Sequence, residues 1–396
     1  MITSLLDTDY YKFTMGQYVY KYDPNVIVEY SLINRKPQVL DLDFWLDIKE
    51  FFYYVRELEN KRFSLAELAY LESLGFSRDY TNFLTTFKLP HIKEVSSFND
   101  VKVVGRWPEA ILWETFLMTI VSEMVGRNLG SMNHSAKFRK FKEKKKKLKC
   151  MSDRPTKPFT FADFGTRRRH SFAWQLDIVS QLSNEFVNFV GTSNVLLSKI
   201  LGRKPVGTNA HELQMVAAAP VLHSIDLIAE VLLQTLNRWI DMYPEYVLLP
   251  DTFGTKFFLN NVCKYQSSIL ENAAGFRQDS GNPKTFTTFL ENELISRHVD
   301  LKKIIYSDGL TINAMNEILS YMENSPVYVS FGWGTNLTND VGGPAPSVVV
   351  KPTRMSPDGD SWYNVVKLSD DLSKATGDKD TIDALIDSMN KYKELK

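Results

Sequence analysis

The chain has 396 residues, and its 47 Lys and Arg residues are balanced by 47 Asp and Glu residues. Its content of 44% hydrophobic and 13% aromatic residues is enough for a large core, which excludes a disordered or fibrous chain. A net charge of zero argues against a surface built throughout for nucleic acid or acidic membranes. The length predicts two domains, or one large barrel with additions.

The cysteines and the N-terminus indicate the compartment. Cys150 and Cys263 match no metal-ligand spacing and no disulfide framework, which is typical of a reducing environment. The N-terminus lacks the basic start and the apolar run of a signal peptide. No apolar stretch approaches the roughly 20 residues that span a bilayer. We therefore expect a cytoplasmic protein that is not embedded in a membrane.

The first third of the chain predicts a mixture of strands and helices. Residues 25–33 are rich in β-branched and aromatic side chains and are expected to form a strand, as are residues 101–104. Apolar spacing predicts helices over residues 44–58 and 65–70, and a buried helix over residues 111–125.

One charge-biased run, Lys140–Lys149 (KFKEKKKKLK), follows this part. Two interpretations are open: a solvated helix that links two domains, or a contact with nucleic acid or polyphosphate. The first is favoured, because a lysine-rich helix without interleaved aromatic residues or glycines is a weak nucleic-acid signal.

Beyond residue 158, short apolar runs end in small polar residues and are each followed by a helical stretch. Six such runs are expected to be strands: residues 159–164, 205–206, 246–249, 274–276, 304–306 and 327–331. This alternation predicts parallel βα units, and their number favours a (β/α) barrel over an open sheet. In such barrels the chemistry lies at the C-terminal ends of the strands, where the polar clusters fall.

Three arginines, Arg167, Arg168 and Arg169, come directly after the first of these strands. Adjacent guanidinium groups repel one another, which predicts an anion among them, and a phosphate or pyrophosphate has room for several forked contacts. The alternative is that one arginine meets an anion while the others pair with acidic side chains.

Residues 207–212 (GTNAHE) follow a strand and open a helix, and Thr208 or Asn209 is the expected cap. His211 then lies in the first turn, where the helix dipole and the free N–H groups favour a phosphoryl group. Taken alone, a histidine at such a position is more often a capping or packing residue.

Two acidic clusters follow later strands. Asp251 begins the segment DTFGT, and Asp279 lies in RQDSG with Arg277 and Ser280. Carboxylates beside small hydroxyl residues suit magnesium or a positive charge developing on a sugar. Turns and helix caps use the same residue types, so each cluster alone is ambiguous.

Glycines mark the loops after two consecutive late strands. Gly309 lies in SDGL, and Gly334 and Thr335 lie in FGWGTN. Backbone N–H groups at glycines approach anions closely, and the phosphate site of many barrels is formed by the loops after the last strands. The two loops predict a site for a sugar phosphate.

Seven segments, in this order along the chain, resemble the nicotinate phosphoribosyltransferase family in its bacterial and fungal branch: LDTDYYK, FGTRRR, GTNAHE, DTFGT, RQDSG, SDGL and FGWGTNLTND. The resemblance runs from about residue 5 to residue 368. It implies the type II phosphoribosyltransferase fold, with an N-terminal α/β domain over residues 1–135, joined by part of 345–396. An irregular (β/α) barrel over residues 136–345 would be the catalytic domain.

The activity implied by the resemblance is the joining of nicotinate to phosphoribosyl pyrophosphate, which yields nicotinate mononucleotide and pyrophosphate for NAD salvage. ATP would be a co-substrate hydrolysed through a phosphohistidine, Mg²⁺ the cofactor, and the enzyme a homodimer with shared active sites. A nicotinamide phosphoribosyltransferase is the nearest alternative, but the arginine block and the histidine segment favour nicotinate. A nucleic-acid binder that uses the lysine run and a non-catalytic homologue are the remaining alternatives.

Site residues carry over only where the motifs match. His211 would be the phosphorylated histidine, and Asp251 and Asp279 the other catalytic residues, at the ribose and the magnesium ion. The resemblance places the substrate-binding residues as follows: Phe164 and Tyr11 of the partner subunit on the two faces of the pyridine, Thr208 beside it, Arg277 at its carboxylate, Arg167 at the pyrophosphate, Ser280 in the Asp279 loop, and Gly309, Gly334 and Thr335 at the 5′-phosphate.

Three positions depart from the family pattern. Asn282 stands where the family usually has Asp, so a carboxylate near the expected metal is missing and the metal ligands stay open. Leu213 replaces the usual Trp after the His-Glu pair. Asn209 is unusual beside the base, and its amide can donate to a carboxylate or accept from a carboxamide.

Overall fold

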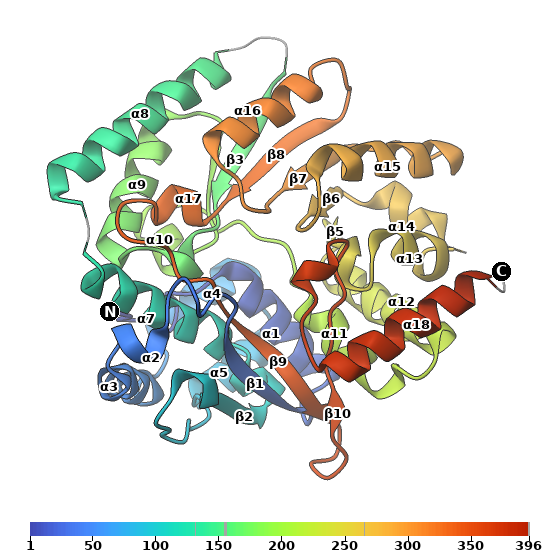
Figure 1. The fold of residues 1–396 in the computed structure, drawn as a ribbon, viewed down its shortest axis with the longest axis horizontal. Helices are drawn as coiled ribbons and strands as arrows, with labels where there is room; N and C mark the ends of the chain where they lie inside the picture. The colour runs from blue at the N-terminus through green and yellow to red at the C-terminus, as the bar shows by residue number, and fades with distance from the viewer. Residues whose placement is uncertain (131, 154–156, 265, 395–396) are drawn as a thin grey trace.

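The computed structural model describes residues 1–130, 132–153, 157–264 and 266–394. Two sheets organise the chain: an antiparallel sheet of four strands and a parallel sheet of six (Figure 1). Helices surround both sheets, and no helix in the described ranges has the length and apolar character needed to cross a membrane.

The antiparallel sheet is built on β1 (Ile27–Asn34), which lies between β2 (Lys102–Arg106) and β9 (Val348–Ser356). A short strand, β10 (Tyr363–Asn364), pairs with β9. The strands predicted at residues 25–33 and 101–104 are therefore confirmed as β1 and β2. Because β9 and β10 come from the last part of the chain, the two ends of the sequence share one sheet (Figure 1). The domain boundary near residue 135 stays a prediction.

The predicted buried helix is α7 (Trp113–Asn128), and every residue from Trp113 to Val125 is buried. The single helix predicted over residues 44–58 is wrong, because the chain forms α2 (Leu42–Trp45) and α3 (Ile48–Glu59) instead. The side chain of Asp47 accepts a hydrogen bond from the backbone of Lys49, and this N-cap starts a new helix.

The parallel sheet has the order β4 (Phe189–Thr192), β3 (Phe159–Asp163), β8 (Tyr328–Trp333), β7 (Lys303–Tyr306), β6 (Gly275–Gln278), β5 (Val247–Leu248). The edge strands β4 and β5 share no ladder in the described residues, so the barrel is irregular. The predicted fold class, an irregular (β/α) barrel with an N-terminal α/β part, is confirmed. The other helices of the described chain are α1 (Tyr10–Tyr22), α4 (Leu65–Ser73), α5 (Arg78–Thr85), α6 (Trp107–Ala110), α8 (His134–Ser152), α9 (Phe172–Glu185), α10 (Val195–Ile200), α11 (Glu212–Ala218), α12 (Ile225–Met242), α13 (Thr255–Phe257), α14 (Ser267–Asn272), α15 (Pro283–Ser296), α16 (Ile312–Tyr321), α17 (Thr335–Thr338) and α18 (Lys379–Glu394).

One predicted barrel strand is misplaced. Residues 205–206 form no strand, and the strand of this unit is β4, which the sequence pattern did not indicate. Val206 donates one backbone hydrogen bond to Thr192, at the end of β4, so the segment runs beside the strand without extending the ladder. Pro205 has no N–H group to continue the pairing.

The lysine run forms part of α8, as the helical interpretation predicts. This helix is attached to the barrel rather than fully solvated: Lys144 is largely buried and donates to a carboxylate oxygen of Asp340 at 2.6 Å and to the carbonyl of Asn336 at 2.6 Å. Lys145 pairs with Glu185 of α9 at 2.6 Å. These contacts use part of the positive charge to hold α8 against neighbouring elements.

Candidate active site

Most of the predicted site residues lie at or just after the C-terminal ends of the parallel strands. The exceptions are Tyr11, which lies in α1, and Thr208 and His211, which lie between α10 and α11. Because the strands are parallel, these ends meet at one rim of the barrel. The chain positions that contribute are the loops after β3, β5, β7 and β8, the segment between α10 and α11, and the end of β6 with the residues after it.

His211 lies at the start of α11 among three side chains from other loops. Its Nδ1 is 3.0 Å from the hydroxyl of Thr252, and its Nε2 is 3.1 Å from Asp279 Oδ2 and 3.5 Å from Asp251 Oδ1. A carboxylate can only accept, so Asp279 holds the proton on Nε2 and the Thr252 hydroxyl donates to Nδ1. This assignment leaves the lone pair of the imidazole on Nδ1.

Burial and neighbouring charges set the protonation of this group. Burial lowers the pKa of His211 below its ordinary value, although Asp251 and Asp279 favour the charged form. Burial alone would raise the pKa of Asp279, but Arg277, His211 and Lys367 hold it well below its usual range. The result is a neutral imidazole beside an ionised carboxylate.

Arg277 joins three loops of the site. Its Nε donates to the Ser307 hydroxyl at 2.9 Å, and its Nη2 donates to Asp279 Oδ1 at 2.9 Å. Its Nη1 donates to the Thr208 hydroxyl at 3.0 Å and to the carbonyl of Asn209 at 3.1 Å. Arg277 therefore lies in contact with the segment that was expected beside the base.

Asp251 is buried behind the histidine. One of its oxygens accepts from Ser280 at 2.5 Å and lies 3.5 Å from the ammonium of Lys367. The other, Oδ1, has no hydrogen-bond partner in the described part of the chain.

The unpaired oxygen of Asp251 and the carboxylate of Asp279 form an oxygen donor set that fits Mg²⁺, which commonly takes one or two carboxylates together with substrate phosphates. Within residues 1–130, 132–153, 157–264 and 266–394, no group of three or more His, Cys, Asp or Glu side chains is placed to hold a metal by itself. A magnesium ion here would therefore depend on the substrate for its remaining ligands.

The three consecutive arginines have three different environments. Arg169 is fully buried and pairs with Asp7 at 2.6 Å and with Glu123 at 2.7 Å, so it is a structural residue. Arg167 pairs with Asp9 at 3.0 Å, while 26% of its side chain remains exposed. The alternative in which some arginines pair with acidic side chains is therefore correct for these two.

Arg168 differs from its two neighbours. No carboxylate of the described residues lies within ion-pair distance of it, and its guanidinium donates to the carbonyl of Val348 at 3.4 Å. Burial, Arg167 and Arg35 lower the pKa of Arg168 to about 10. A partly buried cation among other cations is stabilised by an added anion, so Arg168 is a candidate anion contact to which the family resemblance gave no role.

Two aromatic residues expected at the base lie near this rim. The ring centre of Tyr11 is 5.4 Å from the guanidinium of Arg167 in the same chain. Phe164 follows β3, and its ring covers Gly332 of β8 so closely that a Cβ there would lie 2.4 Å from the ring. Glycine at 332 is therefore required for this position of Phe164.

The two glycine loops are adjacent, as predicted. Asn336 at the start of α17 donates to the carbonyl of Leu310 at 3.0 Å, which connects the Gly334–Thr335 loop to the Gly309 loop. Gly309 has a φ of +55°, which glycine adopts without strain. Ser307 of the same loop reaches Asp279 at 2.7 Å, so both loops adjoin the His211 cluster.

The start of α11 differs from the sequence prediction. Neither Thr208 nor Asn209 caps α11, and His211 itself occupies the N-cap position without a side-chain cap. The hydroxyl of Thr208 instead accepts from Arg277. Asn282 caps α15, because its side-chain oxygen accepts from the backbone of Lys284 at 2.9 Å and of Thr285 at 3.1 Å.

Glu212, which the motifs did not single out, is fully buried next to His211. Its Oε1 accepts from Tyr30 at 2.5 Å and from Trp107 at 2.8 Å, and its Oε2 accepts from Lys12 at 2.5 Å. The donors come from β1, α6 and α1. Glu212 therefore fixes the start of α11, and with it His211, to the N-terminal elements.

Lys12 extends this network to Glu114 of α7 at 2.6 Å, and Lys351 of β9 approaches Glu114 at 2.7 Å. Burial alone would raise the pKa of Glu114, yet Lys12, Lys351 and Arg167 hold it well below its ordinary value. The sequence contained no short-range signal for these residues, because their partners lie far away in the chain.

Known proteins match both parts of this chain. A model of the nicotinate phosphoribosyltransferase (NAPRTase) family matches residues 159–393, and a model of the NAPRTase N-terminal domain matches residues 6–122. The chain belongs to the nicotinate phosphoribosyltransferase family. A nicotinate phosphoribosyltransferase of Desulforapulum autotrophicum is 34% identical over 96% of this chain and 97% of its own length.

Solved structures agree with this membership. The nicotinate phosphoribosyltransferase of Porphyromonas gingivalis superposes with a TM-score of 0.86 at 26% identity, covering 98% of this chain and 100% of that one. A putative nicotinate phosphoribosyltransferase of Saccharomyces cerevisiae gives a TM-score of 0.81 at 27% identity, covering 98% of each chain. The resemblance seen in the sequence motifs is thus confirmed at the level of the family and the fold.

Proposed function

We propose that this protein is a nicotinate phosphoribosyltransferase that forms nicotinate mononucleotide and pyrophosphate, in a step of NAD salvage coupled to ATP hydrolysis. The observation that carries the proposal is the single hydrogen-bond network that joins His211, Thr252, Asp279 and Arg277 at the barrel rim. Membership of the family supports the choice of substrates.

In the transfer step, the pyridine nitrogen bonds to the anomeric carbon while the bond from that carbon to pyrophosphate breaks. Positive charge develops on the sugar and negative charge on the leaving group. Asp251 and Asp279 would stabilise the first, and Arg167 and Arg168 the second. Such a reaction asks the protein mainly for positioning, which the shared network of loops supplies.

Magnesium, when bound by Asp251, Asp279 and the substrate, would neutralise charge on the leaving pyrophosphate. The unpaired Oδ1 of Asp251 supports this assignment. Asn282 does not weaken it, because its side-chain oxygen already caps α15.

The hydrogen bonds of His211 support its proposed phosphorylation. The lone pair on Nδ1 would form the bond to the γ-phosphorus of ATP while the bond from phosphorus to ADP breaks. Asp279 keeps the proton on Nε2 and stabilises the positive ring that results, as an aspartate does beside a catalytic histidine elsewhere. The lowered pKa of His211 keeps the ring neutral, and therefore nucleophilic, before the reaction.

Two further parts of the proposal rest on the family resemblance. The enzyme would be a homodimer with shared active sites. Tyr11 was expected from the partner subunit, whereas here it adjoins Arg167 of its own chain. Nicotinate is proposed over nicotinamide because several cations, including Arg277 and Arg168, adjoin the rim and favour a carboxylate.

Labelling with ATP that carries a labelled γ-phosphate tests the coupling. We expect an acid-labile phosphohistidine that is absent in His211→Ala, while slower transfer from phosphoribosyl pyrophosphate survives in that variant. Label that persists in His211→Ala would show that another residue is phosphorylated. Turnover with nicotinate but not nicotinamide is expected, and the reverse preference would overturn the choice of base.

A further inference from the structure

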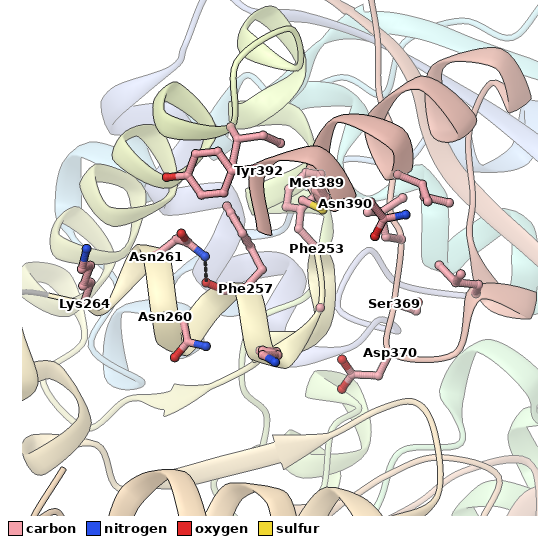
Figure 2. Close-up of a pocket in the computed structure, with 16 residues that line it drawn as sticks. Phe253, Phe257, Asn260, Asn261, Lys264, Ser369, Asp370, Met389, Asn390 and Tyr392 are labelled. Atoms are coloured by element: carbon pink, nitrogen blue, oxygen red, sulfur yellow. Dashed lines mark hydrogen bonds between the residues drawn. The ribbon is translucent and has the colours of Figure 1, made fainter. Parts of the chain in front are cut away.

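A pocket of about 600 Å³ lies against α18 (Figure 2). It is separate from the site described above, because His211, Asp251, Asp279 and Arg277 do not line it. Its walls come from α12, from the chain around α13, from the segment that follows β10, and from α18.

The inner wall of the pocket is aromatic and aliphatic. Phe253 and Phe257 face Met389 and Tyr392 of α18, as Figure 2 shows. The hydroxyl of Tyr392 is bonded to Asp226, so this residue offers its ring rather than its polar end. The volume falls within the range of roughly 300–1,000 Å³ that small-molecule sites occupy.

The polar groups around the pocket are mainly amides and ammonium groups: Lys256, Asn260, Asn261, Lys264 and Asn390. The carboxylate of Asp370 accepts from the backbone N–H and the hydroxyl of Thr255 at 2.7 Å and 2.5 Å, and its single negative charge is outnumbered by the two lysines of the lining. An apolar wall with donors and positive charge at its rim is complementary to an aromatic molecule that carries an anionic group.

We propose that this pocket binds an aromatic anion and that its occupancy is transmitted to His211. The connection is the segment Leu368–Asp370, which lines the pocket on one side and hydrogen-bonds the active site on the other. The N–H groups of Leu368 and Ser369 donate to the carbonyl of Thr252 at 2.9 Å and 3.3 Å. The N–H of Asp370 donates to the hydroxyl of Ser280 at 3.2 Å.

Both contacted residues touch the catalytic groups directly. The hydroxyl of Thr252 binds His211 Nδ1, and the hydroxyl of Ser280 donates to Asp251. Phe253, the residue after Thr252, is itself part of the pocket wall. Thr252 is therefore the only residue that separates the pocket lining from the imidazole of His211.

Ser369 gives this connecting segment a second distinctive feature. It has a φ of +68°, a left-handed conformation that costs energy for a residue with a side chain. Its hydroxyl is buried and has no hydrogen-bond partner in the described residues. The segment is thus held in a strained arrangement by its surroundings, and contacts from a bound molecule would add to the forces that hold it.

The direction of the effect follows from the arrangement present. The pocket exists in the conformation in which Thr252 already engages His211, so a ligand that fits it stabilises this conformation. We therefore expect an activator. This coupling rests on the proposed function, whereas binding to the pocket does not.

The probe 8-anilino-1-naphthalenesulfonate, an aromatic sulfonate that fluoresces in apolar surroundings, tests the binding in the full-length chain. We expect one saturable site that nicotinate and phosphoribosyl pyrophosphate do not displace. Ile386→Trp, which fills the pocket from α18, should abolish binding, and Ser388→Trp on the exposed side of α18 should not. Lys256→Glu should weaken binding about tenfold, whereas Lys379→Glu, outside the pocket, should leave it unchanged.

Equal binding by Ile386→Trp and wild type, or displacement of the probe by the substrates, would overturn the site. In a transfer assay, saturating probe should raise kcat/KM for phosphoribosyl pyrophosphate about fivefold in the wild type and not in Ile386→Trp. A probe that binds the wild type without changing this value would overturn the coupling. Binding as expected by a chain without transferase activity would contradict only the proposed function.

Discussion

His211 and Glu212 are neighbours in the chain but belong to two regions with different electrostatics. Around Glu212 the buried charges are compensated: it accepts from Lys12, Tyr30 and Trp107. Around His211 the groups are left partly unsatisfied, with an unpaired oxygen on Asp251 and an imidazole of lowered pKa. The first arrangement is suited to holding a backbone in place, and the second to receiving a substrate.

The adjacent residues His211 and Glu212 can therefore serve two different purposes. Burying a charge is costly unless it is paired, so the Glu212 network is stable only when complete. The His211 cluster lies at the rim, where 23% of the Asp279 side chain is exposed, and solvent or substrate can satisfy what the protein does not. The tight network thus provides a rigid support for the open one.

Removing the carboxylate of Glu212 is the strongest test of this comparison. Glu212→Ala should lower the free energy of unfolding by about 4 kcal/mol, because it leaves Lys12 short of one counter-charge and two donors without an acceptor. Urea denaturation measures the loss. The control Glu212→Gln keeps an oxygen for Tyr30 and Trp107 and should lose less, so equal losses for both variants would contradict the charge-based argument.

Changing the open region should affect activity more than stability. Asp279→Asn should lower kcat/KM about 100-fold, because it no longer holds the Nε2 proton of His211 as an anion. Its free energy of unfolding should fall by less than that of Glu212→Ala, because the side chain is partly exposed, but it should fall, because the lowered pKa of Asp279 means that its charge stabilises the fold at neutral pH. Steady-state kinetics and urea denaturation give the two values, with the exposed Asp241→Asn as control. If Asp279→Asn lost as much stability as Glu212→Ala, the two regions would not differ in the way proposed.

His170 extends the comparison to a buried histidine that lacks partners. Neither ring nitrogen has a hydrogen-bond partner in the described residues, and burial, with Lys137, lowers its pKa to about 4. Between pH 6.5 and 4 the unfolded chain therefore takes up a proton here that the folded chain does not. This contribution lowers stability as the pH falls through that window.

The variant His170→Phe removes this proton uptake. Relative to its value at pH 7, its free energy of unfolding at pH 4.5 should fall by about 2 kcal/mol less than that of the wild type. Urea denaturation at both pH values measures the difference. Parallel pH dependences for the two proteins would mean that the folded state protonates His170 as readily as the unfolded chain.

The smallest expected effect concerns base choice. Asn209 is buried, and its side-chain oxygen has no hydrogen-bond partner in the described residues. Its backbone carbonyl accepts from Arg277. Asn209→Leu should raise KM for nicotinate about tenfold through loss of an amide donor. Kinetics with nicotinate and nicotinamide measure this, and Asn209→Asp should impair nicotinate further because its charge repels the carboxylate. An unchanged ratio of the two bases in both variants would exclude a contact.

Local pattern predicted most of the fold, and its errors have local causes. Alternation of apolar runs and small polar residues located β3, β5, β6, β7 and β8. It missed β4 because the extended segment at residues 205–206 resembled a strand, although Pro205 cannot continue a ladder. It also joined α2 and α3, since apolar spacing does not register the cap at Asp47.

The candidate site was predicted by residue type but not by partner. The motifs contained His211, Arg277 and Asp279, which the structure brings into one network. They gave no role to Lys367, which approaches Asp251 at 3.5 Å from the segment in which the family resemblance ends. Nor could the motifs show that the three adjacent arginines have different roles, because the partner of Arg169 is Asp7, 162 positions away in the chain.

The sequence by itself determined the family, the parallel βα architecture and the polar residue types that follow the strands, because these depend on neighbouring residues and on their order. Only the tertiary structure decided which charges are compensated and which remain available. Electrostatic interaction and burial depend on distance in space. Residues such as Arg168, Glu212 and Asp251 therefore acquire their different properties only when distant segments of the chain meet.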